Sequence, residues 1–295
     1  ALSGSHNFGL SVSKKSVTLT PDENFSIGED VSVTINTSGI RVVDEIEEQE
    51  VFFDVKSENR QWQFTISTEG SLHYIDSNHP PLGSSYSRGV ALMDLDGDGD
   101  IDAFVANGIG KPDDPTKRIN TVWLNDAGIF SKSDQSLGDS YSYAVELGDL
   151  NGDNHIDAFV ANGSDNADVL FQANRVWLNN GKGIFVSSEQ NIGESDSHGI
   201  ALGDLDGDRD IDAFVANVSN TDNGLDGANR VWLNNGKGEF TETTQRLGSS
   251  NSYSVALKDL DNDGDLDAFV ANYSQPNKVW KNNGKGTFTD SGQSI

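Results

Sequence analysis

The chain of 295 residues contains 47 acidic and 20 basic residues, which gives a formal net charge of -27 at pH 7. Nucleic acid and anionic membrane surfaces are therefore not expected as partners, because both attract lysine and arginine. The absence of cysteine excludes a disulfide framework, a thiol nucleophile and any cysteine-ligated zinc or iron–sulfur site. No apolar run approaches the roughly 18 residues of a membrane-spanning helix, so we do not expect membrane insertion.

The first 81 residues are interpreted as two segments. Residues 1–24 are a tail or a strand that closes a sheet. In residues 25–81, Glu50–Trp62 resembles the strands of the repeated unit that follows, but the acidic loop of that unit is missing. We therefore interpret residues 25–81 as a degenerate copy of the unit, without a metal. A small β-sandwich domain is the alternative, because Ser16–Thr20 and Asp30–Ile35 resemble paired sandwich strands.

One unit then recurs four times within residues 82–295, at a period of 55 residues. Its copies carry acidic loops that begin at Asp94, Asp149, Asp204 and Asp259, and the sequence Ala-Phe-Val-Ala-Asn follows each loop. A fixed period of this size indicates a stack or ring of small structural units.

The second copy shows which elements the unit contains. Val145 and Leu147 lie two residues apart, which is the period of one face of a β-strand. Asp157–Asn162 and Arg175–Leu178 are rich in β-forming residues and predict a second and a third strand. Asn179–Gly183 predicts a tight turn into a fourth strand. Four antiparallel strands in a unit of this size describe one blade of a β-propeller.

The sequence therefore predicts an all-β protein, a β-propeller of four-stranded antiparallel blades. Four blades are clear, and residues 25–81 would supply a degenerate N-terminal blade. A tryptophan and a phenylalanine recur in every clear copy, and we expect them to pack between blades rather than to stack on sugar rings. They are Trp123, Trp177, Trp232, Trp280, Phe104, Phe159, Phe214 and Phe269.

The acidic loops have the composition of sites for a hard divalent cation. Oxygen side chains recur at positions 1, 3, 5 and 9 of each loop, and position 7 would supply a backbone carbonyl. Oxygen ligands favour calcium over zinc, so we expect one Ca2+ ion per loop, about four in all. The candidate ligands are Asp94, Asp96, Asp98, Asp100 and Asp102; Asp149, Asn151, Asp153, His155 and Asp157; Asp204, Asp206, Asp208, Asp210 and Asp212; and Asp259, Asp261, Asp263, Asp265 and Asp267.

The four loops differ in ways that bear on affinity. The second has Asn151 and His155 where other loops have aspartate, and ligand charge tunes calcium affinity. The third has Arg209 at position 6, where a left-handed backbone would cost on the order of 1 kcal/mol. We expect the first and fourth loops, with five aspartates each and no unfavourable neighbour, to bind most tightly.

These loops resemble the FG-GAP family, whose repeats build the propellers of integrin alpha subunits, and resemble its bacterial VCBS-type branch more closely. The resemblance covers about residues 84–290 and rests on the pattern D-x-[DN]-x-D-x-x-x-D before a hydrophobic strand. It implies calcium between the first and second strands of each blade, on one rim, and an extracellular setting. Ala-Phe-Val-Ala-Asn replaces the family's Val-Gly-Ala-Pro-like ending. The best-known members have seven blades, so a ring closed by one chain does not follow.

Function is expected where otherwise similar copies differ. Six residues before the loops stand Arg88, Tyr143, His198 and Tyr253, near the start of the innermost strand of each copy. They could line one end of a central channel, and their types suit an anionic sugar or a proton transfer. We treat them as candidate ligand-binding residues, and the sequence identifies no catalytic residue.

Three functions are compatible with these features. The first is a secreted or cell-surface calcium-binding propeller that acts in adhesion or ligand binding, with a glycan or an extracellular protein as partner. The second is a polysaccharide lyase or another carbohydrate-active enzyme that uses the four variable residues. The third is an extracellular structural subunit that assembles with copies of itself. Because the sequence has no Gly-x-Ser-x-Gly or His-Glu-x-x-His motif, a binding role is favoured over an enzyme.

Overall fold

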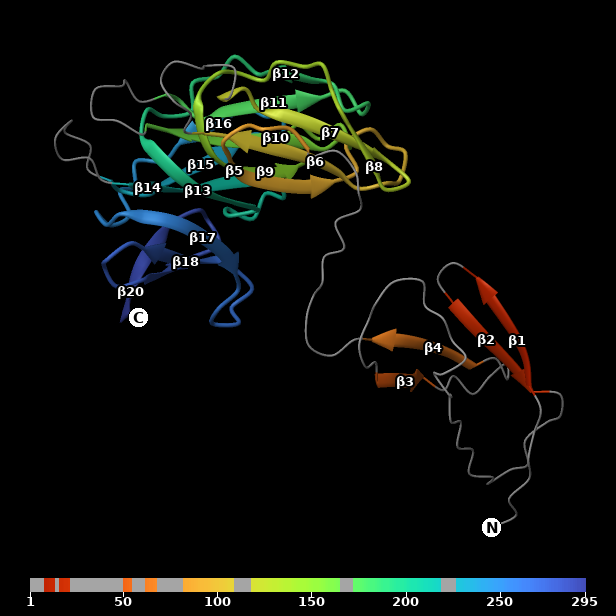
Figure 1. The fold of residues 1–295 in the computed structure, drawn as a ribbon. Helices are drawn as coiled ribbons and strands as arrows, with labels where there is room; N and C mark the ends of the chain where they lie inside the picture. The colour runs from red at the N-terminus through yellow and green to blue at the C-terminus, as the bar shows by residue number, and fades with distance from the viewer. Residues whose placement is uncertain are drawn as a thin grey trace, which may run out of the picture. The chain divides into compact units, whose positions relative to one another are not determined.

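The computed structural model describes four N-terminal strands, within residues 8–13, 16–21, 50–54 and 62–67, and residues 82–108, 118–164, 172–218 and 227–295. The chain divides into two compact units, Ala1–His79 and Pro80–Ile295 (Figure 1). Every sheet in the described part of the chain lies within one of these two units.

The first unit contains one antiparallel sheet. β1 (Phe8–Ser13) pairs with β2 (Ser16–Pro21), β3 (Glu50–Asp54) pairs with β4 (Trp62–Ser67), and β2 pairs with β4. The strand order is therefore β1-β2-β4-β3, and strands from both predicted N-terminal segments share one sheet. The degenerate blade and the small β-sandwich both remain predictions, because the expected strand at Asp30–Ile35 lies outside the described residues.

The second unit contains four antiparallel sheets of four strands, one for each repeat, and consecutive strands are neighbours in every sheet. No helix occurs in the described ranges of this unit, so the prediction of an all-β fold with four-stranded blades is confirmed. The strands are β5 (Ser87–Met93), β6 (Asp102–Asn107), β7 (Thr121–Asp126) and β8 (Ile129–Lys132); β9 (Tyr141–Gly148), β10 (Asp157–Gly163), β11 (Arg175–Asn179) and β12 (Phe185–Ser187); β13 (Asp196–Gly203), β14 (Asp212–Val218), β15 (Arg230–Asn234) and β16 (Phe240–Glu242); and β17 (Ser252–Lys258), β18 (Asp267–Asn272), β19 (Lys278–Asn282) and β20 (Phe288–Ser294).

The first strands of the blades lie next to one another. β5 contacts β9, β9 contacts β13, and β13 contacts β17, as Figure 1 shows for the labelled strands. These four inner strands belong to four separate sheets, so side-chain packing and hydrogen bonds between blades hold the arrangement together.

The asparagine at the end of each Ala-Phe-Val-Ala-Asn strand fixes the connection to the third strand. The backbone N–H of Asn162 donates to Oδ1 of Asn174 at 2.8 Å, and its Nδ2 donates to the carbonyl of Ala173 at 2.8 Å. The hydroxyl of Ser142 donates to Oδ1 of Asn162 at 2.8 Å. Because these buried groups are paired, the two ends of the linker are held at one point. The same bonds recur at Asn107, Asn217 and Asn272.

The core lies between neighbouring blades. Phe104 is fully buried, and its ring meets that of Phe185 in the next blade edge-on, with centroids 5.3 Å apart. Two further pairs have the same geometry, Phe159 with Phe240 and Phe214 with Phe288. Burial of an aromatic side chain of this size contributes about 1.5–3 kcal/mol. Three of the four recurring tryptophans lie in the same layers: Trp177, Trp232 and Trp280 pack in the inter-blade clusters.

Candidate functional site

Each acidic loop curls around its first aspartate. In the first loop, Asp94 accepts hydrogen bonds from the backbone N–H of Gly97 at 2.8 Å and from that of Gly99 at 3.0 Å. Both glycines have a left-handed backbone, with φ of 81° and 94°, a conformation that glycine adopts at little cost. The other loops keep left-handed residues at the same two positions: Gly152, Asn154, Gly207, Arg209, Asn262 and Gly264.

Three of the loops gather carboxylates closely enough to share one ion. One oxygen from each of three aspartates lies within 4.8 Å of the others. The three groups are Asp94, Asp96 and Asp102; Asp204, Asp206 and Asp208; and Asp259, Asp261 and Asp263. Burial and neighbouring carboxylates raise the pKa of Asp96 and of Asp206. Oxygen donors in a flexible loop fit Ca2+, which would relieve this repulsion.

The aspartate at position 9 also has a structural role that the sequence did not predict. Asp157 is fully buried. Its Oδ1 accepts the N–H of Asn179 at 2.7 Å, and its Oδ2 accepts the N–H of Leu150 at 3.0 Å. Burial, the largest effect, raises the pKa of Asp157 to about 6 and that of Asp212 to about 7. This carboxylate therefore ties the loop to the third strand of its own blade, and a nearby cation would favour its charged form.

The second and third loops depart from the first as the sequence indicates. In the second, Nδ2 of Asn151 donates to Asp153 at 3.0 Å, and Nδ1 of His155 lies 3.3 Å from the same carboxylate. Within the described ranges, no group of three carboxylates forms in this loop. In the third, Arg209 has a φ of 79°, so the backbone at position 6 is left-handed, the case in which the sequence predicted a cost for arginine.

The fourth loop has a neighbour that was not expected. Nζ of Lys281 lies 2.8 Å from Oδ2 of Asp261, and this hydrogen bond lowers the pKa of Asp261. The expectation that this loop has no unfavourable neighbour is therefore wrong, because an ammonium group occupies one of its carboxylates. The corresponding residues of the other blades are Leu124, Leu178 and Leu233.

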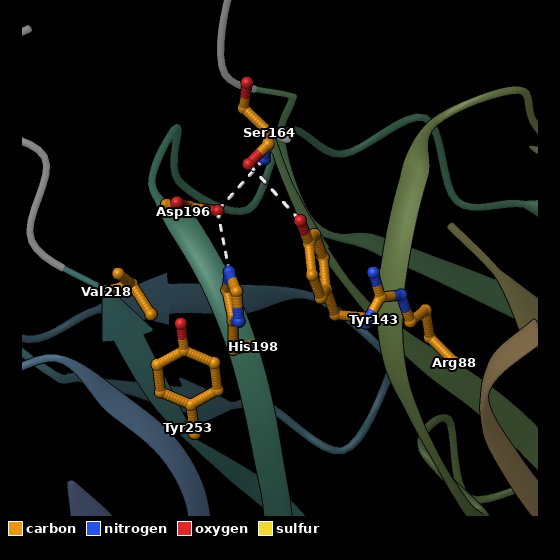
Figure 2. Close-up of a pocket in the computed structure, with 7 residues that line it drawn as sticks. All are labelled: Arg88, Tyr143, Ser164, Asp196, His198, Val218 and Tyr253. Atoms are coloured by element: carbon orange, nitrogen blue, oxygen red, sulfur yellow. Dashed lines mark hydrogen bonds and ion pairs between the residues drawn. The ribbon is translucent and has the colours of Figure 1, made fainter. Parts of the chain in front are cut away.

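The four variable residues meet at the opposite end of the inner strands. A cavity of about 430 Å³ is lined by Arg88, Tyr143, Ser164, Asp196, His198, Val218 and Tyr253, and Figure 2 shows them. Each of the four predicted residues comes from a different blade. The structure thus brings together residues that are 55 positions apart in the sequence.

A β-bulge places each of these four residues. In blade three, Ser197 pairs with Asn217 and Gly199 pairs with Ala216, so that His198 is left without a partner in the ladder. The register shifts in the same way at Arg88, Tyr143 and Tyr253. Bulges of this kind redirect a side chain and are frequent at binding sites. The repeated backbone irregularity therefore occurs at a residue that differs between blades.

The side chains of the pocket form a continuous row. The ring of His198 stacks on Tyr143 with centroids 3.8 Å apart and meets Tyr253 edge-on at 4.8 Å. The guanidinium of Arg88 lies 5.6 Å from the centre of the Tyr143 ring, within reach of a cation–π contact. The exposed ring of Tyr273 lies 5.6 Å from that of Tyr253 and extends the row.

Two residues that sequence reasoning missed orient this row. Oδ1 of Asp196 lies 3.0 Å from Nε2 of His198 and accepts the backbone N–H of Ser164 at 3.0 Å. The hydroxyl of Tyr143 donates to the carbonyl of Ser164 at 3.3 Å, and Figure 2 draws these bonds. A Cβ at Gly163 would meet the Asp196 carboxylate, so a larger residue there would displace that carboxylate.

The sequence contained a signal for Asp196. The position two residues before each variable residue also differs between copies, with tyrosine in the first two and another residue in each of the others: Tyr86, Tyr141, Asp196 and Asn251. The same comparison of copies that identified His198 would have identified Asp196 two residues earlier.

Four-stranded antiparallel blades, each with an aspartate-rich loop between its first and second strands, define a repeat protein of the β-propeller class. The model of the FG-GAP-like repeat family matches residues 94–160, 149–215, 204–270 and 259–295. The chain therefore belongs to the FG-GAP-like repeat family, which confirms the resemblance of its loops. No curated protein matches the chain. The described residues contain no helix that is long and apolar enough to cross a membrane.

Proposed function

We propose that the unit Pro80–Ile295 is a calcium-stabilised extracellular propeller module that binds a saccharide at the pocket of the inner strands. The observation that carries this proposal is the convergence of four bulged, variable residues from four blades on one cavity. The aspartate-rich loops at the other end support a scaffold role for calcium, and FG-GAP-like repeats are typical of extracellular proteins. Adhesion or ligand capture follows from such an arrangement.

The chemistry of the pocket favours a sugar. Tyrosine and histidine rings present apolar faces for stacking and polar groups for hydrogen bonds, and the row of Tyr143, His198 and Tyr253 supplies both. Exposed Tyr253 and Tyr273 extend this surface to solvent. The cavity of about 430 Å³ has the size of a small-ligand site. Arg88 contributes a positively charged guanidinium to the cavity, and this group would pair with an acidic group of the saccharide.

A glycan array probed with the full chain in calcium tests this function. We expect binding to a defined set of glycans. Tyr253→Ala should abolish binding and Tyr253→Phe should retain most of it, because stacking needs the ring and not the hydroxyl. The phenylalanine variant is the matched control, and equal melting temperatures of the two variants would show that both fold. Absence of binding to every glycan, or equal binding by both variants, would overturn the proposal and favour a protein ligand.

A second candidate function is supported by the buried pair of Asp196 and His198. Their side chains are each 9% exposed and lie 3.0 Å apart, so that the carboxylate fixes the imidazole beside the Tyr143 ring. An oriented imidazole near a phenol can transfer a proton, as a polysaccharide lyase requires. Product formation from acidic polysaccharides, lost in both His198→Ala and Tyr143→Phe, would support this enzyme. Activity that survives both substitutions would exclude these residues as catalysts.

A further inference from the structure

The first metal loop is held by the next blade as well as by its own. Leu95 lies between the candidate ligands Asp94 and Asp96 and is 1% exposed. Its backbone N–H donates to Oδ2 of Asp102 in the same loop at 2.8 Å. Its carbonyl accepts a hydrogen bond from Nδ2 of Asn179, a residue of the next blade, at 2.8 Å. The next blade therefore helps to fix the backbone between two ligands of the first loop.

The side chain of Asn179 is buried, and the same residue is bonded to the metal loop of its own blade. Its backbone N–H donates to Oδ1 of Asp157 at 2.7 Å, and its Nδ2 donates to the carbonyl of Ile156 at 3.0 Å. Asp157 is the position-9 aspartate of the second loop, and its Oδ2 accepts the N–H of Leu150 at 3.0 Å. One buried asparagine thus connects the metal loops of two blades.

This connection recurs at the other two contacts between blades. Asn234 donates to the carbonyl of Leu150 and to the carboxylate of Asp212, in each case at 2.8 Å. Asn282 makes the same two bonds to the third and the fourth loop, at 2.8 Å and 2.9 Å. Within a loop, the position-9 aspartate accepts the N–H of the buried leucine and so completes each step. An unbroken series of hydrogen bonds therefore runs through all four loops.

The hairpin that follows Asn179 also packs against the preceding loop. The backbone N–H of Gly183 donates to the carbonyl of Leu95 at 2.9 Å. A Cβ at Gly183 would lie 3.6 Å from Cβ of Asp96 and 2.8 Å from a methyl group of Leu124. Because the contact leaves so little space, a shift of the first loop would displace the hairpin of the second blade.

The charges of the loops supply a reason for such a shift. In three of the loops, oxygens of three carboxylates lie within 4.8 Å of one another, and like charges at this distance repel. Neutralisation of the repulsion by a cation would favour the curled loop, in which the carbonyl of the leucine is in place for the asparagine of the next blade. The state of one loop therefore bears on the order of its neighbour.

We propose that the asparagine at the end of the third strand is a positioning residue that couples the calcium sites of adjacent blades, so that an occupied loop raises the affinity of its neighbours. These residues are Asn179, Asn234 and Asn282. The inference rests on the proposed role of calcium and is independent of the saccharide pocket. Coupling of this kind is reciprocal, and it is strongest between adjacent blades because every further blade adds another asparagine to the series.

Calcium titrations followed site by site in NMR spectra test the coupling. The backbone amides at position 6 of the loops report on the four sites separately: Gly99, Asn154, Arg209 and Gly264. In Asn179→Ala we expect the first and second sites to weaken by about fivefold, whereas the fourth keeps its affinity. Asn282→Ala should weaken the third and fourth sites and leave the first unchanged.

Asn180→Ala is the matched control for both variants. Asn180 is exposed, and its side chain accepts the N–H of Lys182 within its own hairpin at 3.0 Å. All four sites should therefore bind calcium as they do in the parent chain.

Asp208→Ala tests the same coupling without a buried substitution. Asp208 is an exposed candidate ligand of the third loop, so the chain should stay folded and lose the third site. The third loop is bonded to the second through Asn234 and to the fourth through Asn282. We therefore expect the second and fourth sites to weaken several-fold and the first to change less.

Equal weakening of all four sites in Asn179→Ala would show a general structural role and would overturn the proposal. The same holds if Asn180→Ala weakens the first site as much as Asn179→Ala does, or if the second and fourth sites of Asp208→Ala keep their affinity. A parent chain whose amide signals do not respond to calcium would refute the calcium role itself and the coupling with it.

Discussion

Each inner strand of the propeller unit has a uniform end and a variable end. The strand β9 begins near the bulged Tyr143 and is followed at its other end by the loop that starts at Asp149. In the loops, two left-handed positions and a first aspartate that accepts two backbone N–H groups constrain what each position can hold. At the bulge, the residue lies where the register of the ladder shifts, and its type differs between blades. The uniform end therefore maintains the blades, whereas the residues that differ between blades line the pocket.

Removal of a position-9 aspartate should have the largest effect at the uniform end. Asp157→Ala leaves the buried N–H groups of Leu150 and Asn179 without an acceptor, at about 1–3 kcal/mol each. We expect the free energy of unfolding in urea, measured with chelator, to fall by about 3 kcal/mol. Asp139→Ala, at an exposed position, is the control and should stay within about 0.5 kcal/mol. Equal effects of the two substitutions would contradict this role.

The stability of the metal-free protein should fall as the pH rises. The pKa values of Asp157 and Asp212 are raised to about 6 and about 7 in the folded protein, above their ordinary value near 4. At pH values between the unfolded and the folded pKa, the folded state binds more protons than the unfolded state. The free energy of unfolding therefore decreases as the pH rises. We expect the melting temperature with chelator to drop by several degrees between pH 5 and pH 8, and calcium to remove most of this drop. A flat profile with chelator would contradict the burial argument.

Lys281 should weaken the fourth metal site. Its ammonium group lies 2.8 Å from Asp261 and would compete with a cation for that carboxylate. Lys281→Leu, which restores the residue type of the other blades, should raise the calcium affinity of one site several-fold in a calorimetric titration. Lys278→Leu is the control, because Lys278 pairs with Asp290 outside the loop. A gain of the same size in both variants would point to net charge instead.

Arg209→Gly should give the smallest effect. The left-handed backbone of Arg209, with a φ of 79°, costs on the order of 1 kcal/mol that glycine avoids. We expect a gain in unfolding free energy of up to about 1 kcal/mol and tighter calcium binding in the third loop. Asn154→Gly changes the same position of the second loop and should gain less, because asparagine tolerates this conformation. An unchanged affinity of every site in Arg209→Gly would refute the argument from backbone strain.

The sequence was sufficient for the blades and loops because their signals are local. The alternation of Val145 and Leu147 and the 55-residue period report directly on strands and repeats. The strand order of the first unit depends on pairing between β2 and β4, which are distant in sequence, and no local pattern encodes it.

The contacts at the metal loops and at the pocket could not be predicted without the three-dimensional register of the strands. Lys281 and Asp261 are 20 residues apart and meet only because the second and third strands of the blade bring them together. Asp196 and His198 are two residues apart, a spacing that places two side chains on the same face of a strand, and both line the pocket. The β-bulge at His198 is visible only in the register of β13 against β14. The sequence identified the varying positions but not the backbone irregularity that makes them converge.

Thermal unfolding with and without a chelator tests the central claim most directly. The claim is that the metal loops stabilise the blades and that the pocket residues do not. Each occupied site contributes RT ln(1 + [Ca]/Kd), roughly 2.7 kcal/mol when calcium is 100-fold above Kd. We predict that chelation lowers the melting temperature strongly, and by the same amount in His198→Ala as in the parent chain, because the pocket takes no part in metal-dependent stability. A melting temperature that does not change on chelation would contradict the account.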